Sequence, residues 1–168
     1  EGENQMLVEQ VNQSLDTYLR DMIRLSDSIY YNVVKNTDLD EHSVSEEMRL
    51  LYNTYSDYVE NMVLFTGDGE VVATAPAAKL RSGVDVRGTP WFAQAMERTE
   101  NLHFGIPAVQ NLFVDAEHNY KWVISLSCAV ELTRGKDTQL GVLLIDLKYS
   151  ALASLFSSVK LSGSGYVY

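Results

Sequence analysis

Cysteine and basic residues are scarce in this sequence. The 168-residue chain has one cysteine, Cys128, so it forms no internal disulfide bond and its cysteine content indicates no cellular compartment. Only 13 Lys and Arg stand against 23 Asp and Glu, for a formal net charge of −10. This balance excludes nucleic acid as an expected partner and disfavours an anionic membrane surface, because both are bound through basic faces. No apolar run reaches the roughly 20 residues of a membrane-spanning helix.

The motifs of common enzyme classes are also missing. The chain contains no G-x-S-x-G nucleophile elbow, Walker phosphate loop, dinucleotide fingerprint or EF-hand loop. Its histidines, His42, His103 and His118, are isolated and lack the spacing of metal ligands. Cys128 lies among apolar residues without a nearby cation, which favours an inert buried thiol over a nucleophile. We therefore expect a non-catalytic chain that uses no cofactor and no metal.

The first 35 residues have the pattern of one long amphipathic helix. With 46% hydrophobic and 21% charged residues, the chain as a whole has the composition of a folded domain. At 1.5 Å per residue a helix from about Gly2 to Lys35 reaches roughly 50 Å, whereas a compact domain of this size measures about 30 to 35 Å. We expect the helix to extend from the domain as a stalk; burial along its whole length is the alternative. The apolar positions recur every three or four residues: Leu7, Val11, Leu15, Tyr18, Met22, Leu25, Ile29 and Val33.

A polar connector, residues 36–42, leads to a second helix. Ser43 and Glu46 have the spacing of a capping box, and the apolar residues that follow predict a helix that ends near Tyr55. The period then changes to that of a strand. Residues 59–66 and 70–74, joined by Gly67-Asp68-Gly69, predict a β-hairpin.

The stretch VDVRGTPWFAQA, residues 84–95, predicts a loop followed by a short helix. Pro90 can occupy its first turn, and Thr89 can cap it. Trp91 and Phe92 are adjacent, so their rings point in different directions, one toward a core and one toward whatever lies above. We interpret this stretch as a lid over a sheet. The alternative is that both rings pack in an ordinary hydrophobic core.

The rest of the chain predicts further strands. A strand around His103 and an irregular segment through Asn119 precede two strands, at residues 120–132 and 139–148, which are expected to pair with each other. Ser150 can cap a final short helix, and residues 162–165 (SGSG) have the composition of a linker. Leading helices followed by meandering strands predict an α+β fold with an antiparallel sheet.

Asp146 is the first candidate for a functional role. On a strand it shares a face with Val142 and Leu144, and a carboxylate on an apolar face is costly unless a donor or a cation meets it. It can accept hydrogen bonds from a ligand in a pocket. It can equally be a strand-end residue whose partners are backbone amides.

Other polar candidates flank the predicted lid and the strands. Arg87 can hold an anion through paired hydrogen bonds, or it can pair with Asp85 in solvent. The amide of Gln110 can recognise a polar ligand or belong to a hydrated loop. Ser125 and Ser127 alternate with apolar residues, which fits a wet sheet face or the floor of a polar pocket.

The order of these segments resembles that of the extracellular Cache domains, relatives of the PAS fold that sense ligands for bacterial histidine kinases and chemoreceptors. The resemblance rests on the long leading helix, the hairpin VLFTGDGEVVAT, then DVRGTPWFAQA, and finally GVLLIDLKYSALASLF, which together span nearly the whole chain. The segments NLHFGIPAVQNLF and WVISLSCAVELT look especially like the ectodomains of YesM-type sensor histidine kinases of Gram-positive bacteria.

This resemblance implies a central antiparallel, PAS-like sheet of five strands with the long helix packed on one face. A ligand pocket is then expected under the tryptophan turn on the other face. It implies three parts: a stalk helix at residues 1–36, the sensor module at 37–160, and a linker at 161–168 that begins a missing membrane-proximal module. The chain is then the membrane-distal module of a double-Cache ectodomain and a piece of a longer protein.

The resemblance also implies ligand-binding residues, which are Arg87, Thr89, Trp91, Phe92, Gln110 and Asp146. Amino-acid-sensing members typically carry D-P-R-x-R-P-W-Y, whose second Arg binds the ligand carboxylate; Thr89 and Phe92 occupy two of these positions here. Asp146 matches the acidic residue that meets the ligand amine. With half of the amino-acid clamp absent, a sugar, another neutral polar solute or a partner protein is favoured over a free amino acid, and a module without a small ligand is the alternative.

The expected function is that of the extracellular ligand-sensing domain of a plasma-membrane sensor histidine kinase in a two-component system. The expected partners are a small polar solute or a solute-binding protein, and a second copy of the chain that dimerises through the N-terminal helix. A chemoreceptor ectodomain and a non-sensing dimerisation or interaction module are the alternatives.

Overall fold

A computed structural model describes residues 2–114 and 121–154 of the chain. Its helical elements are α1 (Gly2–Ser28), the π-helical segment η1 (Ile29–Val34), α2 (Ser45–Thr54) and α3 (Pro90–Glu97). Its strands are β1 (Val59–Thr66), β2 (Val71–Ala75), β3 (His103–Phe104), β4 (Ala108–Val109), β5 (Trp122–Arg134) and β6 (Asp137–Lys148). Residues 149–154 are helical, so the expected final helix is present, but Ser150 lies within it and not at the predicted cap position. The predicted linker at 161–168 lies outside the described residues.

The strands form one antiparallel sheet in the order β2-β1-β6-β5-β3, and β4 pairs with the same strand as β3. The predicted hairpin is confirmed as β1 and β2, and the predicted pairing of the two long strands is confirmed as β5 and β6. The sheet has six strands and not the expected five. The additional strand is β4, where Ala108 and Val109 pair with Val123 and Trp122 in a segment expected to be irregular.

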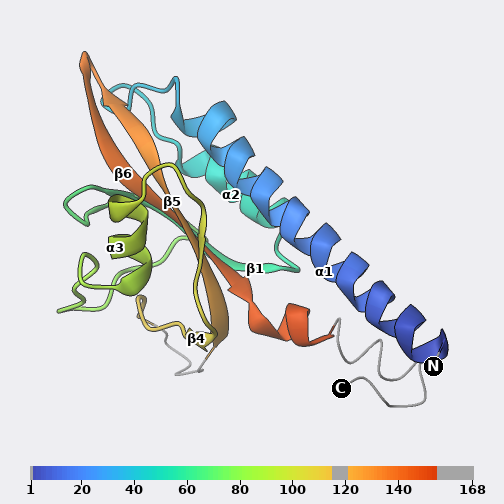
Figure 1. Cartoon of the computed structure of the whole chain (residues 1–168). Coiled ribbons are helices and arrows are strands. Elements are labelled where there is room, and N and C mark those ends of the chain that lie inside the picture. Colours follow the sequence, from blue (N-terminus) through green and yellow to red (C-terminus); the bar gives the residue numbers. More distant parts are fainter. Residues whose placement is uncertain (1, 115–120, 155–168) are drawn as a thin grey trace.

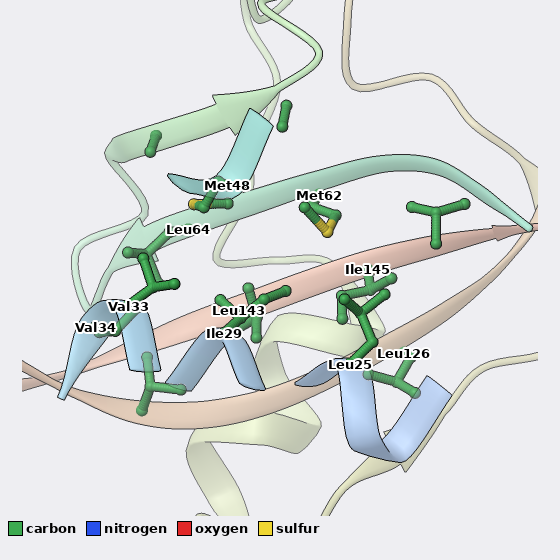
Figure 2. Close-up of a cluster of buried hydrophobic side chains, with 14 of the residues drawn as sticks. Leu25, Ile29, Val33, Val34, Met48, Met62, Leu64, Leu126, Leu143 and Ile145 are labelled. Carbon is green, nitrogen blue, oxygen red and sulfur yellow. The ribbon is translucent and has the colours of Figure 1, made fainter. Parts of the chain in front are cut away.

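The long N-terminal helix is present and continues into η1, where the N–H of Lys35 donates to the carbonyl of Tyr30, five residues back. Figure 1 shows it crossing one face of the sheet, with its N-terminal part extending past the sheet's end. Met22, Leu25 and Ile29 are fully buried in that face. Figure 2 shows this core, in which α1, η1 and α2 meet Met62, Leu64, Leu126, Leu143 and Ile145. Full burial of each such side chain contributes about 1.5–3 kcal/mol to folding.

The predicted capping box of the second helix is wrong. α2 begins at Ser45, the hydroxyl of Ser43 accepts only the N–H of Ser45, and the N-cap residue is Val44. The carboxylate of Glu46 binds the guanidinium of Arg49 and does not reach back to Ser43. Val44 is buried, so apolar contact fixes the start of this helix in place of a side-chain cap.

The segment that follows η1 is fastened to the tip of the β5–β6 hairpin. The carboxylate of Asp38 accepts the N–H of Gly135 at 2.9 Å, and the N–H of Leu39 donates to the carbonyl of Thr133 at 2.9 Å. Gly135 has φ 62°, a backbone conformation that favours glycine in a tight hairpin turn.

The opposite face of the sheet carries α3 and a second, smaller core. Phe92 and Ala95 of α3 pack on Phe65, Val142 and Leu144. The alternation along β6 is as predicted, since Leu143, Ile145 and Leu147 face α1. Within the described residues, no helix combines the length and the apolar character that a bilayer crossing requires.

Candidate ligand-binding site

Asp146 lies on the α3 face of β6, and its side chain is 1% exposed. The alternation of the strand puts it on the same face as Val142 and Leu144, as predicted. In the sheet it stands directly opposite Asn61 of β1 on one side and Ser125 of β5 on the other. The flanking strands therefore bring a polar side chain to each side of the buried carboxylate.

Both oxygens of Asp146 accept a hydrogen bond. The hydroxyl of Ser125 donates to Oδ1 at 2.7 Å, and the amide Nδ2 of Asn61 donates to Oδ2 at 3.0 Å. The alternative of backbone amides as its partners is wrong, because its partners are side chains from the two neighbouring strands. This arrangement offsets the cost of burying a carboxylate.

Gln110 extends this group from above the sheet. Its Nε2 donates to Oδ1 of Asn61 at 3.1 Å, while its backbone N–H donates to the carbonyl of Lys121 at 2.8 Å. Gln110 follows β4, so the segment between β3 and β5 covers this part of the sheet. We call Asn61, Gln110, Ser125 and Asp146 the polar network.

Burial raises the pKa of Asp146 to about 6, against an ordinary value of 3.8. The hydrogen bonds from Ser125 and Asn61 lower it, and the negative charge of Glu60 raises it further. Glu60 itself pairs with Lys121, whose Nζ lies 2.9 Å from Oε1. At neutral pH the network therefore presents a buried carboxylate whose remaining lone pairs can accept hydrogen bonds.

Trp91 adjoins the polar network. Its carbonyl accepts the hydroxyl of Ser127 at 2.8 Å, and Ser127 is two residues from Ser125 on the same face, about 7 Å along the strand. The half-buried Trp91 ring packs on Phe65 with 5.4 Å between centroids. Phe92 is buried in the core beneath α3. The first turn of α3, which carries Trp91 and Phe92, thus covers the apolar half of the face and borders the polar half.

Thr89 and Arg87 lie apart from this group. Thr89 is the N-cap residue and Pro90 occupies the first turn, as predicted, but the Thr89 hydroxyl donates to the carbonyl of Val86 at 2.6 Å and caps no helical N–H. Arg87 is exposed, and its side chain lies against Gly69 of the β1–β2 turn. Asn61 and Thr66 are separated by about 17 Å of strand, so Arg87 is at the far end of β1.

The expected pairing of Arg87 with Asp85 is not formed within the described residues. The carboxylate of Asp85 instead accepts the N–H of Gly88 at 3.2 Å. The structure therefore brings together Asp146 and Gln110, places Trp91 beside them, and separates Arg87 from them.

Asn61 was missed by reasoning from the sequence. It is 5% exposed and joins Gln110 to Asp146, yet it lies in the strand VENMVLFT, which is otherwise mostly apolar. The signal available in the sequence was a polar residue that alternates with Val63 and Phe65, and therefore shares their face of the strand. Its connection to Asp146 depends on the β1–β6 pairing, which spans 85 residues of sequence.

Comparison with known proteins gives structural neighbours only. No protein-family model matches the sequence, and no curated protein matches it. The ligand-binding domain of the amino acid chemoreceptor PctC of Pseudomonas aeruginosa PAO1, solved in complex with GABA, matches with a TM-score of 0.71 at 18% identity. This match covers 99% of the present chain and 70% of that chain.

Two other chemoreceptor domains are similar. That of CtaA from Pseudomonas fluorescens, in complex with L-alanine, has a TM-score of 0.66 at 18% identity and is matched over 94% of this chain and 64% of its own. The sensory domain of Tlp3 from Campylobacter jejuni, with isoleucine bound, has a TM-score of 0.58 at 17% identity and is matched over 90% of this chain and 62% of its own. The chain thus spans less than two thirds of the length of both domains. These likenesses confirm the predicted α+β fold, with its antiparallel sheet and long N-terminal helix, as one that this chain shares with the ligand-binding domains of these chemoreceptors.

Proposed function

We propose that the chain is the extracellular ligand-sensing domain of a bacterial plasma-membrane receptor and that it binds a small polar solute at the polar network. The observation that carries this proposal is Asp146, a buried carboxylate held between Asn61 and Ser125 on the face that α3 partly covers. Buried polar groups of this kind cost stability, so a hydrogen-bonded cluster of them on the α3 face of the sheet is suited to recognition there.

In this proposal the ligand presents hydrogen-bond donors to Asp146 and lies beside Trp91. Gln110 covers it from above, and Phe92 and Thr89 support the turn from which Trp91 projects. A sugar or another neutral polar solute fits this chemistry, because the exposed cation Arg87 is at the other end of β1. The amino acids and GABA bound by the structural neighbours are the second class to be screened.

Signalling in this proposal uses α1, which lies on the other face of the same strands. A ligand that binds one arrangement of β5 and β6 more tightly than another shifts the balance between them, and the shift is limited by that difference in affinity. We propose that the full-length receptor is a YesM-type sensor histidine kinase in which this chain is the membrane-distal module. Leu19 and Ile23, exposed apolar residues of α1, support dimerisation through this helix.

A thermal-shift screen of sugars, amino acids and organic acids tests the binding proposal. A ligand present at 100 times its dissociation constant adds about 2.7 kcal/mol to the free energy of unfolding. We expect Asp146→Ala and Trp91→Ala to abolish this shift, and the exposed carboxylate variant Asp57→Ala to keep it. A ligand that stabilises all three variants as much as the parent chain would refute the site.

The second candidate is a chemoreceptor ectodomain, which the structural neighbours favour. Incubating the full-length protein with radiolabelled ATP separates the two. A histidine kinase phosphorylates itself and becomes labelled, whereas a chemoreceptor has no kinase activity of its own and stays unlabelled.

A further inference from the structure

A hollow of about 350 Å³ lies between the C-terminal half of α3 and the edge strand β3. This volume is within the range of sites that hold small molecules. The hollow is distinct from Asp146, because β5 lies between β3 and the strand of Asp146, which puts these two strands about 10 Å apart across the sheet. It is lined by Gln94, Glu97, Arg98, Leu102, His103 and Phe104.

The edge of β3 contributes backbone groups to this region. The N–H of Gly105 donates to the carbonyl of Ser125, so the backbone groups of Gly105 point toward β5. Orientation alternates along an antiparallel strand, and the N–H and C=O of Phe104 therefore point outward from the sheet. One donor and one acceptor of the same residue stand next to each other at the outer edge.

The side chains of the hollow carry both signs of charge. Arg98 and Glu97 are exposed, and neither forms an ion pair or a side-chain hydrogen bond within the described part of the chain. Nε2 of His103 lies 3.0 Å from the carbonyl of Arg98 and must donate to it, which leaves Nδ1 of the neutral ring as an acceptor. Leu102 is half-buried and Phe104 is 41% exposed, so they supply an apolar wall.

We propose that this hollow is a second binding site, for a free α-amino acid in its zwitterionic form. The carboxylate lies at the guanidinium of Arg98 and the N–H of Phe104, and the ammonium lies at the carboxylate of Glu97 and the C=O of Phe104. A simple anion is disfavoured by Glu97 and by the negative end of the α3 dipole. A simple cation is disfavoured by Arg98. A ligand that carries both charges matches the two signs of charge that line the hollow.

Titration of the ¹⁵N-labelled chain with L-alanine, followed by NMR, tests this site. We expect the amide signals of residues 94–98 and 102–104 to shift with a single saturable dissociation constant. Acetate and ethylamine, which each carry one of the two charges, are expected to bind at least tenfold more weakly. The variant Arg98→Gln is expected to weaken L-alanine binding at least tenfold, and Glu97→Gln to weaken it several-fold.

Two control variants keep this result distinct from the polar network and from general electrostatics. Arg134→Gln removes another exposed guanidinium, at the end of β5, and is expected to leave the dissociation constant unchanged. Asp146→Asn alters the polar network and is also expected to leave the dissociation constant unchanged. The inference is overturned if acetate binds as tightly as L-alanine, if Arg134→Gln weakens binding as much as Arg98→Gln, or if no amide of residues 94–104 shifts. Shifts that vanish in Asp146→Asn would assign the ligand to the polar network instead.

Discussion

The two faces of the sheet are built from the same strands but differ in composition. The face under α1 is apolar along the middle of β1 and β6, at Met62, Leu64, Leu143 and Ile145. The face under α3 begins in the same way, with Phe65, Val142 and Leu144, and then changes to Asn61, Ser125 and Asp146. Close packing on the first face stabilises the fold, whereas the second keeps polar groups that cost stability. The sheet therefore separates the surface that holds the long helix from the surface that can recognise a solute.

Truncation on the apolar face is expected to have the largest effect. Leu25→Ala removes a fully buried side chain of α1 and leaves a cavity, so we expect a loss of about 2–5 kcal/mol in the free energy of unfolding. Urea denaturation measures it. Leu19→Ala, on the exposed side of the same helix, is the matched control and is expected to change stability by less than about 0.5 kcal/mol. Equal losses would mean that α1 is not held by this face.

The polar face is expected to make stability depend on pH through Asp146. Its pKa of about 6 in the folded chain exceeds the ordinary value of 3.8, so the folded state binds the proton more tightly than the unfolded state. The resulting stabilisation is complete below about pH 4 and is lost as the pH rises through about 6, a difference on the order of 3 kcal/mol.

Other carboxylates titrate in the same range, so the measurement is the difference between the parent chain and Asp146→Asn. We expect the free energy of unfolding of the parent to gain on that of the variant as the pH falls from 7 to 4. Parallel pH profiles would show that Asp146 titrates normally in the folded chain.

Ser127 marks the border between the apolar and polar halves under α3, and its loss is expected to have a smaller effect. Ser127→Ala leaves the carbonyl of Trp91 without its donor, at a cost of about 1–3 kcal/mol. We expect the substitution to increase the rate of amide hydrogen exchange more in α3 than in β1. A uniform change across the protein would indicate that the bond does not position the helix.

Gln110→Ala is expected to have the smallest effect, about 0.5–1.5 kcal/mol, because it removes one hydrogen bond from a half-buried side chain. Its main consequence is expected at Asp146, whose neighbour Asn61 loses its partner. Gln139→Ala, on an exposed position of β6, is the control. NMR titration of the Asp146 carboxyl is expected to change in the first variant and to stay the same in the second.

Much of the fold could be predicted from the sequence because it depends on local period. The alternation of residues 139–148 predicted which side chains of β6 share a face, and the Gly67-Asp68-Gly69 turn predicted the hairpin. β4 was not predicted, because two residues carry no period and pair only when β5 lies beside them. The cap at Ser43 failed because burial of Val44 determines where α2 begins.

The candidate site could be predicted only in part. Asp146 was identified because a charge on an apolar strand is conspicuous within a few residues of sequence. Its partners could not be identified in the same way, since Asn61 and Ser125 meet it through strand pairings that separate them by 85 and 21 residues. Arg87 is close to Trp91 in sequence, but the loop directs it toward Gly69.

The attachment of Asp38 to the tip of the β5–β6 hairpin has a mechanical consequence. From Asp137 to Asp146 the strand pair measures about 30 Å, with the buried carboxylate at one end and the exit of the N-terminal helix tied to the other. Two hydrogen-bonded strands resist stretching. A displacement of β6 at Asp146 is therefore expected to be transmitted along the hairpin to the segment that follows η1. Movement can thus reach the end of the long helix through the backbone of one hairpin, without repacking the core between them.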